Sequence, residues 1–436
     1  MRRPATLVIL IAALFLAARA YTAAPKRRPP VRAPHITAAQ RAAALKKVEA
    51  NLRVPAGTVL QQPGALVPFF ERLARIAPGP TPDPVHILHF GDSHTAADEW
   101  TGGLRELFQQ RFGDGGSGFS LAGHPFAGYR RLDARGGATN AWHSDGLRTG
   151  AGDGYFGLGG VSISTERAGQ SVFLNTDCDH LEIQYLQQPD GGSLAFYQDD
   201  QLLQEFSTEG ELSPAYAEFQ TDPGEHRFTL KTLDSHPVRL FGWVIDRPAG
   251  VTYEALGING AEAAVMLRWN QEMLATYVQR RNPGLIVLAY GANEASDPNW
   301  TPDAYQSMFS ALLEHLRADA PAASILVIGP ADRWVRSRGT WRLVPGIDFV
   351  VAAQRTACRE NRCAFWDLRE RMGGKQSMRD WVTAGLGQAD RVHFTEAGYR
   401  RLAATLFDDL MRQFALYRRA RQETDQVSHG QANPDR

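Results

Sequence analysis

Apolar residues form short, almost uninterrupted runs in two separated parts of the chain. The run V-H-I-L-H-F occupies residues 85–90, and similar runs lie at 285–290, 325–328 and 364–366. Strands that are buried on both faces of a parallel sheet have this pattern. Stretches with the character of helices lie between and around them, at 36–53, 66–76, 97–112, 261–281, 302–318, 347–357 and 396–412. This alternation predicts an α/β fold with a parallel sheet and helices on both of its faces.

The middle of the chain has a different pattern. Residues 129–250 contain many Gly, Asp and Ser turns, with short alternating runs at 171–174, 181–185, 194–197, 226–231 and 238–244. Such runs are typical of a β-sandwich or jelly roll. We therefore expect an inserted β-sandwich at 129–250, which divides the α/β domain into a first part, 36–128, and a second part, 251–416.

The two ends of the chain differ from the rest in composition. Arg2 and Arg3 precede an apolar run and a group of small residues, which predicts a secretory signal peptide at 1–20. The apolar run is shorter than the roughly 20 residues that a membrane span needs, and an uncleaved anchor remains the alternative. The Pro- and Arg-rich residues 21–35 predict a flexible spacer. The charged, Gln-rich residues 417–436 predict a disordered tail.

Composition and charge limit the classes of partner. With 43% hydrophobic and 22% charged residues, the chain of 436 residues is typical of a globular protein. Its 47 basic residues balance its 47 acidic ones, so no net field favours nucleic acid or an anionic membrane surface. A polyanionic substrate would need a local cluster, either Arg130 with Arg131 or Arg333 with Arg336 and Arg338. A solvated basic face is the simpler explanation of each cluster.

The three cysteines give little indication of a site. Cys358 and Cys363 are close enough in sequence for a local disulfide in an exported protein. The alternative is that both are small buried hydrophobic residues. We expect Cys178 to be buried and inert, because no metal-binding pattern surrounds it. We expect no metal site, and the acyl transfer considered below requires no metal or organic cofactor.

Candidate catalytic residues follow two of the predicted elements. Ser93 comes just after Gly91, where the first strand ends, and such a serine is either a nucleophile or an ordinary helix N-cap. Asp390 and His393 stand before the last helix, three residues apart, so they can pair within one turn. A serine hydroxyl needs a base to remove its proton, and a histidine base needs a carboxylate to orient it. A surface Asp beside a packed His is the alternative explanation of the pair.

Two further positions supply candidate oxyanion donors. Asn293 follows the strand at 285–290 and offers a side-chain amide, although an Asn there is usually a turn former. The backbone N–H groups of Gly260 and Ser93 are the other candidates. Acyl transfer develops negative charge on the substrate oxygen, and preorganised donors aimed at that oxygen stabilise it.

These residues resemble the four blocks of the SGNH hydrolases, also called the GDSL esterase and lipase superfamily. The blocks are Gly-Asp-Ser at 91–93, Gly260, Gly-x-Asn at 291–293 and Asp-x-x-His at 390–393, in that order. The resemblance implies a flavodoxin-like α/β domain with Ser93 as nucleophile, His393 as base and Asp390 as its orienter. It also implies Ser93, Gly260 and Asn293 as oxyanion donors. His94 departs from the leucine in the superfamily name, at a position that varies.

A narrower resemblance is to the bacterial peptidoglycan O-acetylesterases, over roughly residues 85–415. It rests on G-D-S-H-T-A-A-D at 91–98, G-D-G-G-S-G-F at 113–119, F-W-D-L-R at 365–369 and Met-Gly-Gly at 372–374. The Gly-rich loop lacks the Lys and Ser/Thr of a phosphate-binding loop. The family has an inserted β-sandwich that resembles a carbohydrate-binding module. In that module, stacking on sugar is one role for Trp142, Tyr155, Phe156 and Trp243, and core packing is the other.

The resemblance implies a serine esterase that removes 6-O-acetyl groups from N-acetylmuramic acid in peptidoglycan. Its partner would be peptidoglycan or another O-acetylated glycan, and its location the periplasm. We expect a monomer that contacts no nucleic acid and no membrane beyond an N-terminal anchor. Three alternatives stay open: an esterase of another acetylated polysaccharide, an O-acetyltransferase, and a glycan-binding protein with a relic hydrolase domain.

Overall fold

The computed structural model describes residues 36–431 except 56, 58, 78, 80 and 81. The predicted signal peptide at 1–20 and spacer at 21–35 lie outside the described residues. The chain divides into two compact units, Met1–Ala38 and Ala39–Arg436, and the fold below is that of the second. Within the described part of the chain, no helix has the length and apolarity needed to cross a membrane.

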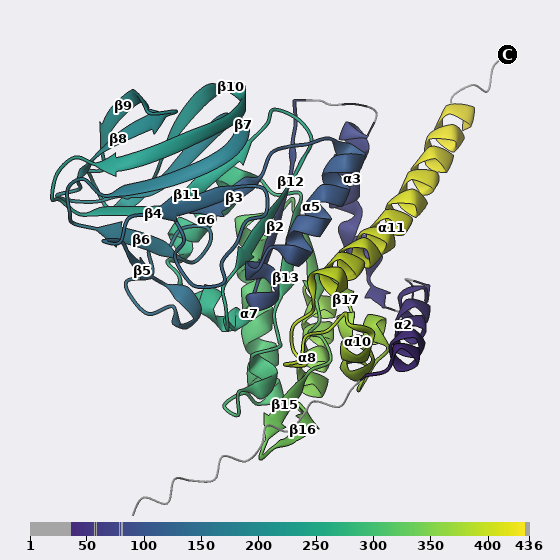
Figure 1. Cartoon of the computed structure of the whole chain (residues 1–436). Helices are drawn as coiled ribbons and strands as arrows, with labels where there is room; N and C mark the ends of the chain where they lie inside the picture. Colours follow the sequence, from purple (N-terminus) through teal and green to yellow (C-terminus); the bar gives the residue numbers. More distant parts are fainter. Residues whose placement is uncertain (1–35, 56, 58, 78, 80–81, 432–436) are drawn as a thin grey trace, which may run out of the picture. The chain divides into compact units, whose positions relative to one another are not determined.

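A six-stranded sheet forms the centre of the α/β region (Figure 1). Its strands lie in the order β1-β17-β14-β13-β2-β12, and all neighbours are parallel except β1 and β17. The parallel strands have the 2-1-3-4-5 order of flavodoxin-like folds, in which the direction of winding reverses between β2 and β13. The bounds are β1 Leu60–Gln61, β2 Val85–Gly91, β12 Val251–Gly257, β13 Leu285–Ala289, β14 Ser324–Ile328 and β17 Ala364–Trp366.

Helices cover both faces of this sheet, which confirms the predicted α/β fold. Neighbouring side chains of β2 point to opposite faces, so Leu88 joins one hydrophobic cluster and Ile87 the other. Leu88 packs in the cluster of α6 Gln271–Arg281, α7 Pro302–Asp319 and α8 Ile347–Glu360. Ile87 packs in the cluster of α3 Val67–Ile76, α5 Glu99–Phe112, α10 Met378–Ala384 and α11 Glu396–Gln431. The remaining α-helices are α2 Ala38–Leu52, α4 Ser93–Ala96 and α9 Leu368–Met372.

A nine-stranded sheet occupies the middle of the chain and lies beside the six-stranded sheet in Figure 1. All its strand pairs are antiparallel, and it has a hydrophobic cluster of its own. It includes β3, which precedes the boundary predicted at residue 129. The bounds are β3 Gly118–Leu121, β4 Arg135–Ala138, β5 His143–Asp145, β6 Ser162–Thr165, β7 Ser171–Gln187, β8 Ser193–Gln198, β9 Gln201–Ser207, β10 Ser213–Thr232 and β11 Val238–Asp246.

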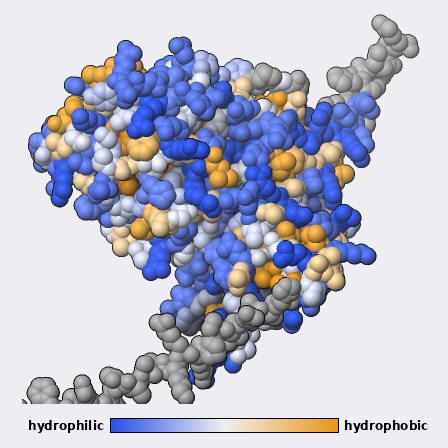
Figure 2. Space-filling model, viewed as in Figure 1, coloured by the Kyte–Doolittle hydropathy of each residue, from blue (hydrophilic) through white to orange (hydrophobic). Residues whose placement is uncertain are grey.

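The aromatic side chains suggested for sugar stacking mostly serve the core. Phe156 and Trp243 are 0% and 1% exposed, so neither ring can meet a sugar. Trp142 and Tyr155 are half-buried and pack against hydrophobic clusters. The side of the molecule seen in Figure 2 is mostly hydrophilic, with small and separated apolar patches.

A buried ionic network joins the two sheets. Arg281 of α6 donates to Glu254 of β12 at 2.5 Å and to Asp246 of β11 at 2.6 Å. The second carboxylate oxygen of Glu254 accepts the backbone N–H of Phe119 in β3 at 3.0 Å. Because Glu254 interrupts the apolar pattern of 251–257, β12 is absent from the strands predicted above.

Three predictions about local structure were wrong. The helix expected at 261–281 is a 3₁₀ helix, Ala263–Arg268, followed by α6, because Asn270 accepts the N–H of Met273 and begins a new helix. The last helix does not end near 412, and residues 417–431 are helical, not disordered. Cys358 and Cys363 are free and buried, which fits the alternative of two small core residues.

Candidate active site

Ser93 begins α4 where β2 ends, at the point where the winding of the sheet reverses. Asp92 caps this short helix, since its Oδ1 accepts the N–H of His94 at 3.0 Å. The helix packs closely on the strand: a Cβ on Gly91 would lie 2.2 Å from the Thr95 Oγ1, so only glycine fits there. Ser93 is thus both the first helical residue and a hydroxyl at the carboxyl end of the sheet, where ligands bind in such folds.

The side chains of Ser93, His393 and Asp390 form a continuous hydrogen-bonded chain. The Ser93 Oγ lies 2.8 Å from the His393 Nε2, and the His393 Nδ1 lies 2.7 Å from the Asp390 Oδ2. The His393 and Asp390 side chains are 32% and 44% exposed, so a substrate can reach them. The structure therefore brings Ser93 into contact with His393, which lies 300 positions further along the sequence.

The Asp390 carboxylate is held by the turn that it begins. Its Oδ1 accepts the backbone N–H of Val392 at 2.9 Å and of His393 at 3.1 Å. Partial burial alone would raise the pKa of Asp390, but hydrogen bonds from His393 and from the turn outweigh it and hold this pKa below its ordinary value. Asp390 is therefore a carboxylate at neutral pH. Arg391 within the turn has a left-handed backbone, with φ of 57°.

The candidate oxyanion donors lie around the same strand ends. The N–H of Ile258 donates to the Gly91 carbonyl at 3.0 Å, which fixes the loop that carries Gly260 beside β2. Gly260 has a φ of 73°, a conformation that favours glycine. Within the described residues, no backbone acceptor is paired with the N–H of Gly260 or of Ser93. Both groups are therefore free to donate to a substrate.

The Asn293 amide, predicted to donate to the substrate oxygen, already donates two hydrogen bonds within the protein. Its Nδ2 donates to the Ala261 carbonyl at 2.8 Å and to the Asp92 Oδ2 at 3.3 Å. The bond to Asp92 is long, and of the two it is the one directed to the Gly-Asp-Ser turn. A substrate oxygen would have to replace Asp92 as the acceptor.

Sequence reasoning missed two buried neighbours of the relay. Burial raises the pKa of Asp92 to about 6, against the hydrogen bond from the His94 N–H and the positive charges of His393 and Arg333. Burial, together with those two charges, lowers the pKa of His94 to about 3, so His94 is neutral. Its Nδ1 lies 2.8 Å from the Tyr399 hydroxyl, and its ring centroid lies 5.1 Å from that of His393. The ring of His94 therefore packs against the ring of His393. Asp92 and His94 both lie in the motif at 91–98, but their burial and pKa shifts depend on tertiary packing, which the sequence does not show.

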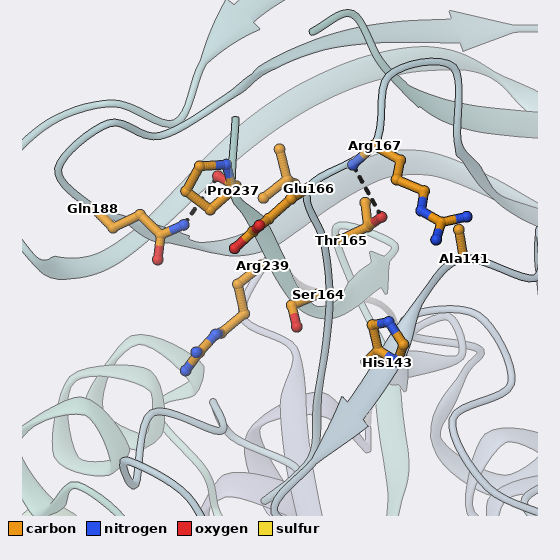
Figure 3. A pocket seen from close by; sticks show the side chains of 10 residues that line it. Ala141, His143, Ser164, Thr165, Glu166, Arg167, Gln188, Pro237 and Arg239 are labelled. Carbon is orange, nitrogen blue, oxygen red and sulfur yellow. Dashed lines mark hydrogen bonds between the residues drawn. The ribbon is translucent and has the colours of Figure 1, made fainter. Parts of the chain in front are cut away.

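The candidate site reaches the surface, because the side chains of His393 and Asp390 are partly exposed. Gly260 lines a cavity of about 310 Å³ together with Arg148 and Arg268. Two cavities on the nine-stranded sheet are larger, at about 370 and 630 Å³, and the first is drawn in Figure 3 with Arg239 and His143 in its wall. Neither of them contains a residue of the Ser93 relay. Among the described residues, no three His, Cys, Asp or Glu side chains are grouped as a metal site would require.

This geometry provides the groups that acyl transfer requires. A hydroxyl is hydrogen-bonded to an imidazole, and a carboxylate on the other ring nitrogen orients the imidazole. N–H groups without a backbone acceptor lie on Ser93 itself and on Gly260, in the loop that follows the neighbouring strand β12. The arrangement can generate a serine nucleophile and stabilise an oxyanion.

Comparison with known proteins points to the same class. The profile of the GDSL-like Lipase/Acylhydrolase family matches residues 231–401, which include Gly260, Asn293, Asp390 and His393 but not Ser93. A solved peptidoglycan O-acetylesterase is 27% identical, with a TM-score of 0.67 over 80% of this chain and 96% of its own. No curated protein sequence matches.

Two further solved structures resemble the chain only weakly. A family two carbohydrate esterase from Cellvibrio japonicus is 11% identical, with a TM-score of 0.29 over 65% of this chain and 98% of its own. One from Clostridium thermocellum, in complex with cellohexaose, is 12% identical, with a TM-score of 0.29 over 58% and 95%. These two likenesses carry no argument.

The protein is a carboxylic ester hydrolase, and its residues 231–401 match the GDSL-like Lipase/Acylhydrolase family. Among the solved structures compared above, the peptidoglycan O-acetylesterase has the highest identity and TM-score with this chain.

Proposed function

We propose that the protein is a serine acetylesterase that acts through Ser93, His393 and Asp390. The observation that carries this proposal is the pair of hydrogen bonds, 2.8 Å and 2.7 Å long, that joins the three side chains at the switch point of the sheet. A helix N-cap role for Ser93 would not require an imidazole at its hydroxyl. In this structure Asp92 supplies the side-chain acceptor at the start of α4.

In the first step, His393 removes the proton of Ser93 while the serine oxygen attacks the acetyl carbonyl. The negative charge then lies on the former carbonyl oxygen, which accepts hydrogen bonds from the N–H groups of Ser93 and Gly260. Asn293 adds a third donor by exchanging its long contact with Asp92 for the substrate oxygen. Such donors strengthen their bonds as charge develops, which lowers the barrier.

The intermediate then collapses: the bond from the acetyl carbon to the sugar oxygen breaks, and the protonated His393 gives its proton to that oxygen, so the sugar leaves as a hydroxyl. The acetyl group remains on Ser93 as an ester. His393 then removes a proton from water as the water attacks this ester, and it returns this proton to the Ser93 oxygen as acetate leaves. Asp390 stabilises the cationic form of His393 in both halves. No step draws on a metal or an organic cofactor.

The substrate class that we propose is an O-acetylated glycan, and specifically the 6-O-acetyl group of N-acetylmuramic acid in peptidoglycan. The likeness to a solved peptidoglycan O-acetylesterase over most of both chains supports this choice. We also propose that the nine-stranded sheet is the inserted β-sandwich and contacts glycan. We also propose that the protein acts in the periplasm, and the signal pattern at 1–20 supports this location.

Acetate release from three substrates tests the proposal. We expect the wild type, but not Ser93→Ala, to release acetate from O-acetylated peptidoglycan. Release from acetylated xylan or a soluble acetyl ester alone would keep the mechanism and reject peptidoglycan. Transfer of the acetyl group to an added sugar in place of water would identify a transferase. Equal release by the wild type and Ser93→Ala would reject Ser93 as the nucleophile and leave the glycan-binding alternative.

A further inference from the structure

A β-hairpin is attached directly to the turn that carries the catalytic pair. It consists of β15 Trp334–Ser337 and β16 Thr340–Leu343, and Figure 1 shows it near the end of α8. The N–H of Trp334 donates to the carbonyl of Arg391 at 3.1 Å. Arg391 lies between Asp390 and His393 in sequence, so the hairpin borders the site on the side of the imidazole.

One face of the hairpin carries two indole rings and one guanidinium group, and Arg391 of the neighbouring turn adds a second guanidinium group. The register pairs Trp334 with Leu343 and Arg336 with Trp341, and these alternate residues share a face. The Arg391 guanidinium lies over the rings of Trp334 and Trp341, 5.3 Å and 4.5 Å from their centroids. We call Trp334, Arg336, Trp341 and Arg391 the arginine–tryptophan face.

The positive charges of this face are not neutralised within the protein. Among the described residues, neither Arg336 nor Arg391 forms an ion pair with a carboxylate. Burial, and then the positive charge of Arg379, lower the pKa of Arg391. The other basic pair indicated by the sequence differs, because Arg130 pairs with Glu99 and Arg131 with Asp133. Of these two groups, the one on the hairpin is therefore the one whose guanidinium groups form no ion pair among the described residues.

The proposed chemistry directs the leaving group toward this face. In the tetrahedral intermediate, the oxyanion and the leaving oxygen are different substituents of one carbon. The oxyanion is held by the N–H donors, while the leaving oxygen must reach His393 to receive its proton. The sugar that carries this oxygen therefore lies over His393, and the hairpin is hydrogen-bonded to the turn that carries His393.

We propose that the arginine–tryptophan face is a subsite for a carboxylate on the leaving glycan. The inference rests on the proposed esterase function and narrows its substrates to acidic glycans. Guanidinium groups pair with carboxylates in a planar, bidentate geometry, and stacking on Trp334 and Trp341 preorganises the Arg391 group for this contact. None of the four residues of this face takes part in bond making or breaking.

A ligand titration followed by NMR tests the subsite on the full chain without turnover. N-acetylmuramic acid is compared with its methyl ester, which differs in the sugar's own carboxylate. Muramyl dipeptide, with and without esterified carboxyl groups, presents peptide carboxylates instead. We expect the free acid of at least one pair to bind more tightly than its ester, with a preference that weakens as salt is added.

The variants Arg336→Glu, Arg336→Lys and Arg342→Glu localise the effect. Arg336→Glu should reduce the preference for the acid about tenfold, because it replaces an attraction with a repulsion. Arg336→Lys should retain most of it. Arg342 is exposed on the opposite face of the same hairpin, across from Val335, so Arg342→Glu is the matched control and should retain the preference.

Equal binding of acid and ester in both pairs, or no binding of either, would overturn the subsite. An equal loss of preference in Arg336→Glu and Arg342→Glu would overturn it as well, since a general field would then explain the binding. Failure of the proposed function has a different signature, namely the absence of Ser93-dependent acetate release. The titration does not depend on that release and can be repeated on Ser93→Ala.

Discussion

At the residue scale, the Asp390–His393 pair depends on a turn that local sequence already encodes. The spacing of three residues lets Asp390 accept two backbone N–H groups of the turn and the imidazole N–H of His393. This part of the site was predictable from sequence because it is local. Contact with Ser93 was not local, and its prediction relied on the order of the four motif blocks.

Two substitutions separate the roles within the pair. His393→Ala removes the base and should lower kcat on an acetyl ester by at least about 10⁴-fold. Asp390→Asn leaves the imidazole in place without its anionic partner, and its loss should be smaller. Steady-state rates on one soluble acetyl ester measure both. A larger loss in Asp390→Asn than in His393→Ala would contradict this assignment.

Glu294, next to Asn293, gives a test that depends on pH. Its side chain is fully buried, and its Oε1 accepts the N–H of Ala263 at 2.8 Å. Burial raises the pKa of Glu294 from 4.5 to about 8, so the folded protein keeps a proton that the unfolded chain has lost. The stability that this proton provides is full below pH 4.5 and is lost as the pH rises through 8.

Glu294→Gln keeps the acceptor and removes the titration. We expect it to match the wild type at pH 4.5 and to exceed its free energy of unfolding at pH 8 by about 2 kcal/mol or more, since one pKa unit corresponds to about 1.4 kcal/mol. Urea unfolding at a series of pH values measures the difference. A constant difference across this range would exclude the raised pKa as its cause.

At the element scale, the pattern of apolar and polar residues predicted most strands and helices, but it did not predict the tertiary contacts between them. The buried strands β2, β13, β14 and β17 lie where apolar runs predict them. β12 and the hairpin β15–β16 were missed, because Glu254 and the arginines break the apolar pattern for reasons that only tertiary contacts explain. The extension of α11 beyond residue 412 was missed for a similar reason: Phe414 is buried against Phe70 and Phe112, with ring centroids 5.8 Å and 5.7 Å away.

Truncation of α11 tests this packing. Ending the chain after Arg412 removes the buried Phe414 ring and should cost about 3 kcal/mol of stability. Ending it after Gln422 keeps this ring, and the side chains described beyond it, Glu423, Thr424 and Gln426, are exposed, so the change should stay within about 0.5 kcal/mol. Thermal unfolding of the two shortened chains checks the result. Equal stability of the two would mean that the helix beyond Arg412 does not stabilise the fold.

At the scale of the whole molecule, the insertion of a β-rich segment separates Ser93 from the rest of its site. The ionic network around Glu254 ties the nine-stranded sheet to the strand beside β2, so the loop with Gly260 is positioned from both sides. The α/β class and the β-rich middle followed from sequence because each has its own hydrophobic period. The network, the buried His94 and the arginine–tryptophan face did not, since each joins residues that are distant in sequence.

Covalent labelling of the nucleophile tests the central claim most directly. A fluorophosphonate ester reacts with a serine that a neighbouring imidazole activates, and peptide mass spectrometry locates the adduct. We predict one adduct, on Ser93, which is absent from Ser93→Ala and strongly reduced in His393→Ala. An adduct on another serine, or equal labelling of the wild type and His393→Ala, would contradict the Ser93–His393–Asp390 relay.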